Sequence, residues 1–265
     1  MYTSFQLAKK YLHYYFTASN GKGHGVHSPF VFDFIQQILR DRKQYDCYVE
    51  IEQRRRQLQA DSNVIEVEDF GAGSAVIKTN SRVVKDIANS SLKPKKYAQL
   101  LFRMVRYYKP LAVVELGTSL GITSAYLAQG YGPAKLFTCE GAASIAAIAQ
   151  QTFDKLQVKN VEVIKGDFTV TLPELFSKIE TVDFVFIDGN HREEPTLQYF
   201  QQLLNHSTAL TIFIFDDIHW SAGMEAAWQT IQQHPAVTLT VDLFFIGLVF
   251  INPDFKVKQH FSIRF

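Results

Sequence analysis

The feature that most constrains the fold is an alternation of short apolar runs and helix-like segments in the second half of the 265-residue chain. Helical spacing of apolar residues follows the first, second, fourth and fifth runs. The fourth run is almost continuously apolar, as a strand covered on both faces requires. This alternation predicts an α/β fold with parallel strands joined by helices. The predicted strands are residues 111–116, 135–139, 161–164, 182–187 and 210–215.

The end of the chain differs in kind. Two strand-like runs, residues 237–241 and 246–251, are separated by only a few residues. Because a parallel crossover needs a dozen residues or more, these runs are expected to form an antiparallel hairpin at a sheet edge. The sequence therefore predicts a Rossmann-like, doubly wound sheet that is mostly parallel and ends in a C-terminal antiparallel hairpin.

The first part of the chain predicts helices without the strand alternation. Residues 5–16 and 30–39 have helical spacing, and residues 97–108 form an amphipathic pattern that leads into the first strand. We interpret residues 1–95 as an N-terminal helical cap or lid and residues 96–265 as the main domain. The glycine-containing segments GHGVHSPF (23–30) and DFGAGS (69–74) are expected to serve the lid or the acceptor, because residues 77–85 are too polar and broken to complete a βα unit.

Composition narrows the class of protein. With 47% hydrophobic and 20% charged residues, the chain can bury a sizeable core, which excludes a disordered protein. Two cysteines favour a reducing compartment, and no signal peptide or membrane-spanning run is visible, so we expect a cytoplasmic protein without a membrane partner. Residues 1–110 hold 18 Lys/Arg against 10 Asp/Glu, a basic excess that fits either an anionic partner or, more simply, packing on the acidic second half.

The end of the first predicted strand and the turn that follows it, VVELGTSLG (113–121), carry the clearest chemical signal. Glu115 ends the strand, Gly117 permits a tight turn, and Gly121 lets the next helix pack closely. Such a turn presents backbone N–H groups at the edge of a sheet where nucleotide-like ligands bind. Ser119 replaces the middle glycine of the dinucleotide fingerprint, which argues against a pyrophosphate ligand.

Acidic residues also end the other predicted strands. They are Glu140, Asp167 (followed by Phe168), Asp188, and the pair Asp216 and Asp217. Because parallel strands end at the same edge of a sheet, these side chains are expected to define a single site. The glutamate after the second strand is suited to accept hydrogen bonds from both hydroxyl groups of a ribose.

The motifs ELGTSLG, TCEG, GDF, FVFIDGNH and FDDIHW, in this order, resemble those of the class I S-adenosylmethionine-dependent methyltransferases. The nearest group is the small-molecule O-methyltransferases related to catechol O-methyltransferase. The resemblance covers about residue 97 to the C-terminus. It implies S-adenosylmethionine as cofactor and methyl transfer to an oxygen, less readily a nitrogen, of a small molecule.

The resemblance also implies residue roles. Glu140 would bind the ribose, Asp167 and Phe168 would flank the adenine, and Asp188 would lie beside the sulfonium. The cofactor-binding residues that it implies are Glu115, Gly117, Thr118, Ser119, Gly121, Thr123, Glu140, Asp167, Phe168 and Asp188.

Two ways of activating the acceptor remain open. In the metal-dependent branch, two aspartates and an asparagine hold a Mg²⁺ or similar ion, and the matching residues are Asp188, Asp216 and Asp217, the last in place of asparagine. His191 matches the position of a general-base lysine, and an imidazole can take the proton of an alcohol or phenol. The resemblance thus makes Asp188 and His191 the catalytic residues, with His219 and Trp220 as further candidates to line the acceptor pocket.

Two other functions are compatible with the sequence. The basic first part could clamp RNA for a nucleic-acid methyltransferase, although no N-P-P-Y-like tetrapeptide is present and we expect no nucleic acid partner. A non-catalytic binding protein could keep only the cofactor fold, but the acid at every strand end disfavours it. A homodimer is possible.

Overall fold

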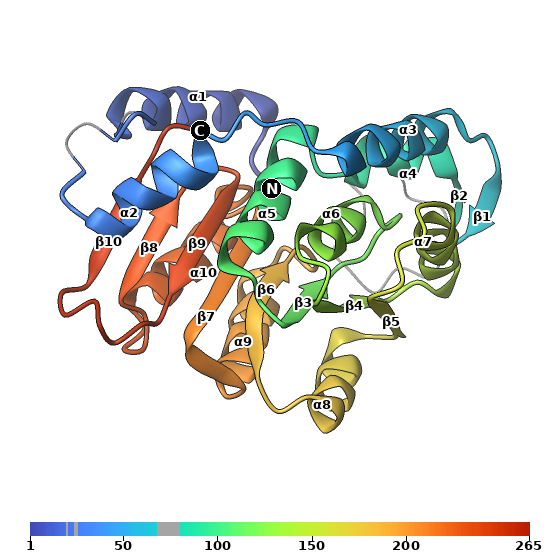
Figure 1. Ribbon diagram of the computed structural model, residues 1–265. Helices are drawn as coiled ribbons and strands as arrows, with labels where there is room; N and C mark the ends of the chain where they lie inside the picture. The colour runs from blue at the N-terminus through green and yellow to red at the C-terminus, as the bar shows by residue number, and fades with distance from the viewer. Residues whose placement is uncertain (20, 24–25, 68–79) are drawn as a thin grey trace. The chain divides into compact units, whose positions relative to one another are not determined.

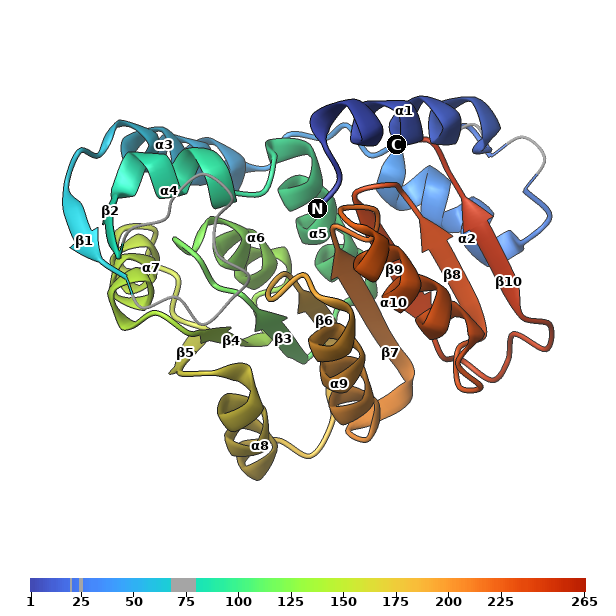
Figure 2. The ribbon, with the colours of Figure 1, turned by 180° about the vertical axis from the view of Figure 1, so that it is seen from behind.

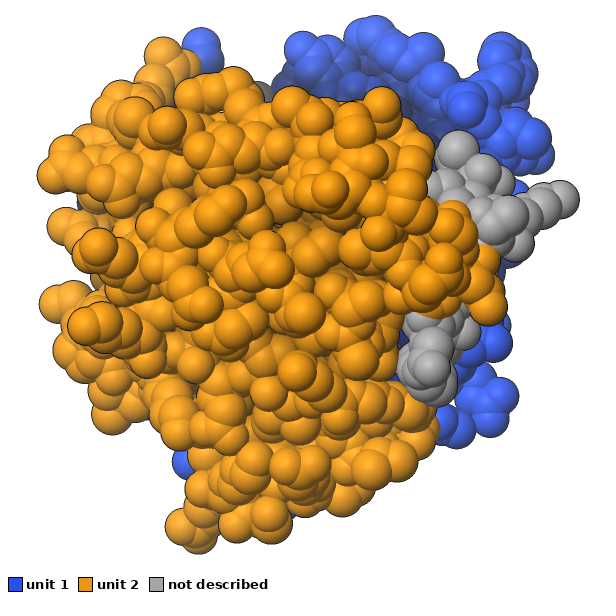
Figure 3. Space-filling model, turned by 90° about the vertical axis from the view of Figure 1, so that its right-hand side faces the viewer, with its two compact units in different colours: residues 1–41, 181–265 blue, residues 42–180 orange. Residues whose placement is uncertain are grey.

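A computed structural model describes residues 1–19, 21–23, 26–67 and 80–265. The chain divides into two compact units (Figures 1 and 3). Unit 1 contains residues 1–41 and 181–265, and unit 2 contains residues 42–180. A domain boundary near residue 95 stays a prediction.

Unit 2 contains the first three predicted parallel strands, β3 (Ala112–Leu116), β4 (Lys135–Glu140) and β5 (Val161–Lys165), in the order β3-β4-β5. Val113, Val114 and Leu116 are fully buried, which explains the continuous apolar run. Both predicted crossover helices are present, and a further helix follows β5. These helices are α6 (Ile122–Gly130), α7 (Ala143–Lys155) and α8 (Phe168–Lys178).

The remainder of unit 2 precedes β3. It contains α3 (Asp46–Ala60), β1 (Val64–Glu66), β2 (Ser81–Val83), α4 (Val84–Ser91) and the predicted α5 (Lys95–Tyr108). Tyr48 of α3 packs edge-on against Phe102 of α5 and Tyr126 of α6 in one apolar cluster. Strand β2 pairs antiparallel with β1 and leads directly into α4, so residues 81–91 do not form a parallel βα unit. DFGAGS (69–74) lies outside the described residues.

Five neighbouring strands of unit 1 follow the order β10-β8-β9-β7-β6 (Figure 2). The parallel pair β6 (Val182–Ile187) and β7 (Ser207–Asp216) matches the predicted fourth and fifth strands. Strands β8 (Leu239–Asp242) and β9 (Ile246–Phe250) form the predicted antiparallel hairpin. Helices α9 (Glu193–Leu204) and α10 (Ala222–Gln233) follow β6 and β7. The predicted α/β, Rossmann-like fold with mostly parallel strands is thus confirmed.

The predicted edge position of the hairpin is wrong. Strand β9 lies between β7 and β8, and β8 is covered in turn by the parallel strand β10 (Gln259–Ser262). The residues of β10, QHFS, are only partly buried or exposed, so this strand needs no apolar run. A short polar strand of this kind protects a sheet edge from pairing with other chains.

The N-terminal helices belong to unit 1 and agree with the predicted segments. They are α1 (Ser4–Thr17), which begins with a capping box formed by Thr3 and Gln6, and α2 (Pro29–Phe34), which continues into a π-helical turn, η1 (Ile35–Leu39). Tyr11 and Tyr14 pack on Phe244, which follows β8. His24 of GHGVHSPF lies outside the described residues.

Candidate active site

The turn after β3 is tight, as its glycines predict. Gly117 (φ 103°), Ser119 (φ 48°) and Gly121 (φ 81°) all have positive φ. The N–H groups of Gly117 and Thr118 both donate to the carbonyl of Cys139, at 3.0 and 3.2 Å. A Cβ on Gly121 would lie 3.0 Å from the ring of Phe153, so glycine is needed where α6 begins. The turn therefore brings α6 close to its neighbours and holds the backbone of residues 117–121 in one conformation.

Glu140, at the end of β4, holds this turn from the other side. Its Oε2 accepts the Ser119 N–H at 2.9 Å, and its Oε1 accepts the Ala142 N–H at 3.0 Å. The carboxylate is half-buried, and each of its oxygens can accept more than one hydrogen bond. Glu140 is thus both a fixed part of the two βα turns and an acceptor suited to hydroxyl groups.

Glu115 is fully buried at the end of β3. Its Oε2 accepts hydrogen bonds from the hydroxyl groups of Ser124 and Thr138, the latter at 2.7 Å. Its Oε1 has no hydrogen-bond partner among the residues that the structure describes. Burial raises the pKa of this carboxyl group to about 8, so the protonated form predominates at neutral pH. A buried oxygen of this kind calls for a hydrogen-bond partner from another molecule.

The remaining cofactor candidates of unit 2 lie as follows. Thr123 is buried in the first turn of α6. Asp167 caps α8, because its Oδ1 accepts the Thr169 N–H at 2.8 Å and the Thr169 hydroxyl at 2.5 Å. Phe168, the first residue of α8, is half-buried. A structural role is therefore established for Asp167, and its adenine role stays a prediction.

In unit 1, three candidate residues come together. Asp188 follows β6, Asp216 ends β7, and His191 lies in the loop after Asp188, with its Nε2 3.7 Å from an Asp188 carboxylate oxygen. Asp188, His191 and Asp216 each offer one ligand atom, and these atoms lie within 4.8 Å of one another. Asp216 is almost completely buried, at 1% exposure.

Asp217 does not belong to this group, although the sequence predicted it as a ligand. Its backbone is left-handed (φ 52°), and its N–H donates to the carbonyl of Phe245 at 2.6 Å. His191 occupies the third place instead. The signal for this was present in the sequence, since His191 lies three residues after Asp188, but the sequence does not say whether the imidazole is a base or a ligand.

His219 has both ring nitrogens engaged. Nδ1 lies 3.0 Å from Glu225, and Nε2 lies 2.8 Å from Asp242. Glu225 also accepts hydrogen bonds from Tyr2 and Lys10. Burial opposes protonation of His219, but the two carboxylates outweigh it and raise the pKa of the imidazole. His219 therefore links Glu225 and Asp242, and its place in the acceptor pocket stays a prediction.

Comparison with known proteins identifies the region that holds these residues. The family model described as "Methyltransferase domain" matches residues 114–218, from β3 to just beyond Asp217. Residues 114–218 are thus similar to a methyltransferase domain. The matched range contains Glu140 as well as Asp188, His191 and Asp216.

The chain is also similar to catechol O-methyltransferase of Mus musculus, with 33% identity over 94 residues. The match spans 34% of this chain and 36% of the mouse protein, so the chain matches only about a third of the length of this relative.

Two solved structures share the fold over most of the chain. The O-methyltransferase from Bacillus cereus, solved with SAH, is 19% identical and has a TM-score of 0.57 over 83% of this chain and 97% of its own. The O-methyltransferase TomG from Streptomyces achromogenes, solved with SAM, is 18% identical and has a TM-score of 0.57 over 79% and 91%. These likenesses support the class I methyltransferase fold. Within the described residues, none of the helices is both long and apolar enough to cross a membrane.

Proposed function

We propose that this protein binds S-adenosylmethionine and transfers its methyl group to an oxygen atom of a small molecule. The observation that carries the proposal is the turn after β3, where Glu140 fixes the backbone of Ser119 beside the buried Glu115. This turn lies within the range that matches the methyltransferase family model. The B. cereus and S. achromogenes structures, which hold SAH and SAM, support the same cofactor.

The residues present fit this cofactor better than a dinucleotide. Glu140 offers acceptor oxygens to the hydroxyl groups of a ribose, and Ser119 stands where the middle glycine of the dinucleotide fingerprint would approach a pyrophosphate. The buried Oε1 of Glu115 also calls for a hydrogen-bond partner. When bound, S-adenosylmethionine supplies a methyl group on a sulfonium, which is already a good leaving group.

We assign the cofactor contacts by resemblance. The turn after β3 and Thr123 would hold the methionine part, Glu140 the ribose, Asp167 and Phe168 the adenine, and Asp188 the surroundings of the sulfonium. The protein's main task is then to align the acceptor oxygen with the methyl group and to exclude other reactions.

The group of Asp188, His191 and Asp216 is suited to handle the acceptor's proton. His191 can accept a proton at its imidazole, with Asp188 close enough to stabilise the resulting charge. The two carboxylates and the imidazole also fit a divalent cation, such as Mg²⁺ or a transition metal that accepts nitrogen ligands. Such an ion would lower the pKa of an acceptor hydroxyl group. We propose His191 as a participant in either case.

Calorimetric titration with S-adenosylhomocysteine tests the cofactor assignment. We expect a micromolar dissociation constant, which is roughly −8 kcal/mol, and no binding of NAD or ATP under the same conditions. Binding of NAD that is as tight as that of S-adenosylhomocysteine would refute the assignment. A screen of phenols, alcohols and amines with S-adenosylmethionine would then identify the acceptor class.

A further inference from the structure

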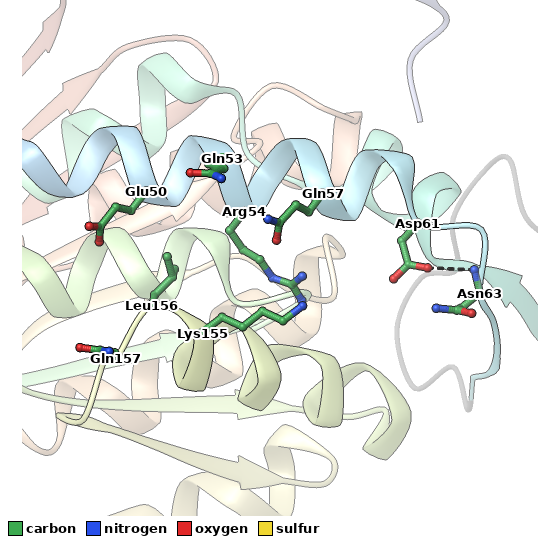
Figure 4. Close-up of a pocket in the computed structure, with 9 residues that line it drawn as sticks. All are labelled: Glu50, Gln53, Arg54, Gln57, Asp61, Asn63, Lys155, Leu156 and Gln157. Carbon is green, nitrogen blue, oxygen red and sulfur yellow. Dashed lines mark hydrogen bonds between the residues drawn. The ribbon is translucent and has the colours of Figure 1, made fainter.

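A cavity in unit 2 lies apart from the residues described so far. It has a volume of about 720 Å³ and lies between α3 and the C-terminal end of α7 (Figure 4). A volume of this size is typical of pockets for small molecules. None of the residues that line it is a candidate for cofactor or acceptor binding.

Arg54 forms an unusual part of the wall. The residue is only 5% exposed, and its Nε donates to the hydroxyl of Thr152 at 3.2 Å. No carboxylate of the described chain forms an ion pair with its guanidinium. Burial lowers the pKa of Arg54, an effect that the more distant Asp61 partly offsets, but an arginine still stays charged. A buried cation normally has a counter-charge, and none of the described residues supplies one at ion-pair distance.

A second cation meets Arg54 in the cavity. Figure 4 shows the ammonium end of Lys155 beside the guanidinium of Arg54, with the amide of Gln57 directed to the same space. Two like charges in this arrangement repel each other unless an anion lies between them. Asp61 does not fill that place, because it lies farther along the cavity and its Oδ1 accepts the Asn63 N–H at 2.9 Å.

A purely structural role for the two cations explains less. Cations near a helix C-terminus can satisfy its last carbonyl groups. In α7, however, the carbonyl groups of Thr152, Phe153 and Asp154 already accept the N–H groups of residues 156, 158 and 157. Arg54 bonds to the side chain of Thr152 and not to a carbonyl group. Only the weak attraction of the helix dipole remains as a structural reason.

We propose that this cavity binds a polar small molecule through one phosphate or carboxylate group held between Arg54 and Lys155. The planar fork of an arginine matches the oxygens of either group, and the lysine adds a second charge. The amide of Gln57 and the carboxylate of Glu50 would bind the polar remainder of the ligand. The site does not depend on the proposed methyl transfer.

The test begins with the full chain and simple anions. Inorganic phosphate and acetate are titrated at constant ionic strength, and amide chemical shifts are followed by NMR. We expect saturable shifts in residues 50–63 and 155–157 with at least one of the two anions. Glucose 6-phosphate separates the sources: tighter binding than inorganic phosphate indicates a phosphorylated small molecule, and equal binding indicates free phosphate. No saturable shift with either simple anion would overturn the proposal.

Variants separate binding from folding. Lys155→Gln, at an exposed position, is expected to weaken anion binding at least tenfold, and Lys159→Gln, an exposed lysine outside the cavity, less than twofold. Arg54→Gln is expected to abolish binding, and its thermal unfolding shows whether the fold is kept. Equal effects of the two lysine variants would refute the site. Displacement of the anion by S-adenosylhomocysteine would place it in the cofactor site instead and would also refute the proposal.

Discussion

Substitution of Glu140 by alanine tests the cofactor site most directly. The carboxylate accepts two backbone N–H groups, from Ser119 and Ala142, and we propose that it also accepts the ribose hydroxyls. Hydrogen bonds to a charged group contribute about 1.5–3 kcal/mol. Loss of this interaction with the ligand corresponds to a dissociation constant for S-adenosylhomocysteine about 10 to 150 times larger.

The same substitution also removes support from the turn. Because both hydrogen bonds are only partly buried and water can replace the carboxylate, we expect a loss of about 1–2 kcal/mol in stability. For a chain of this size, that loss lowers the melting temperature by about 2–8 °C. Binding is therefore measured by calorimetry at 20 °C, where the variant remains folded.

The matched control is Glu162→Ala. Glu162 lies on β5 in the same unit and forms ion pairs with Lys135 and Lys178, at 2.8 and 3.0 Å, but it is no cofactor candidate. We expect its affinity for S-adenosylhomocysteine to equal that of the wild type. If Glu140→Ala lowers the melting temperature but binds S-adenosylhomocysteine normally, the ribose role is wrong and the carboxylate serves the turn alone.

Three further predictions concern other parts of the site. Gly121→Ala is expected to lower the free energy of unfolding by about 1–3 kcal/mol in chemical denaturation, because its φ is 81° and its Cβ would meet Phe153. His191→Ala is expected to lower the rate of methyl transfer by about 10²-fold, measured as formation of S-adenosylhomocysteine in the presence of an acceptor. EDTA should abolish that activity, and Mg²⁺ restore it, if the group also holds an ion. Glu115 has a raised pKa, so its contribution to stability is present below about pH 4.5 and is lost as the pH rises through about 8. The stability of Glu115→Gln relative to the wild type should therefore increase over that range in unfolding experiments.

Each of these predictions has a control within the chain. A Cβ on Gly132 meets nothing within 4 Å, so Gly132→Ala should be nearly neutral, and equal effects at the two glycines would contradict the packing argument. His13→Ala, on the exposed part of α1, should leave turnover unchanged. Full activity of His191→Ala in EDTA would refute both hypotheses, a general base at His191 and a metal ion in the group. A pH-independent difference between Glu115→Gln and the wild type would show that Glu115 titrates normally.

Strands β3, β4 and β6 could be predicted because their apolar runs are buried on both faces. Helix α3 could not be predicted in the same way. Two of its buried positions are Arg54 and Arg55, whose charges hide the helical period in a stretch that resembles a solvated segment. Strand β10 was missed because an edge strand needs no apolar run.

For the site, the sequence predicted the residue types but not all of their contacts. The link from Glu140 to the Ser119 N–H depends on the positive φ of Ser119, a residue type that rarely adopts it. Backbone conformation also decides which residues belong to the group of Asp188, His191 and Asp216. A left-handed backbone at Asp217 accompanies its absence from the cluster, while the loop after Asp188 brings His191 into it. Spacing along the chain does not reveal such backbone reversals.

Unit 1 is built from the two ends of the chain, residues 1–41 and 181–265, and this has a consequence for synthesis of the chain. The inner face of α1 packs on Phe244, about 230 residues later, and Ser19 forms a bridge with Ile263 near the end of the chain. At 5–20 residues per second, roughly 10 to 50 seconds pass on the ribosome before these partners emerge. Unit 2, a continuous segment, can complete its own contacts during that interval. The nascent helix α1 meanwhile presents Tyr11 and Tyr14 without their final neighbours, so it is the segment of this protein that chaperones are expected to bind first.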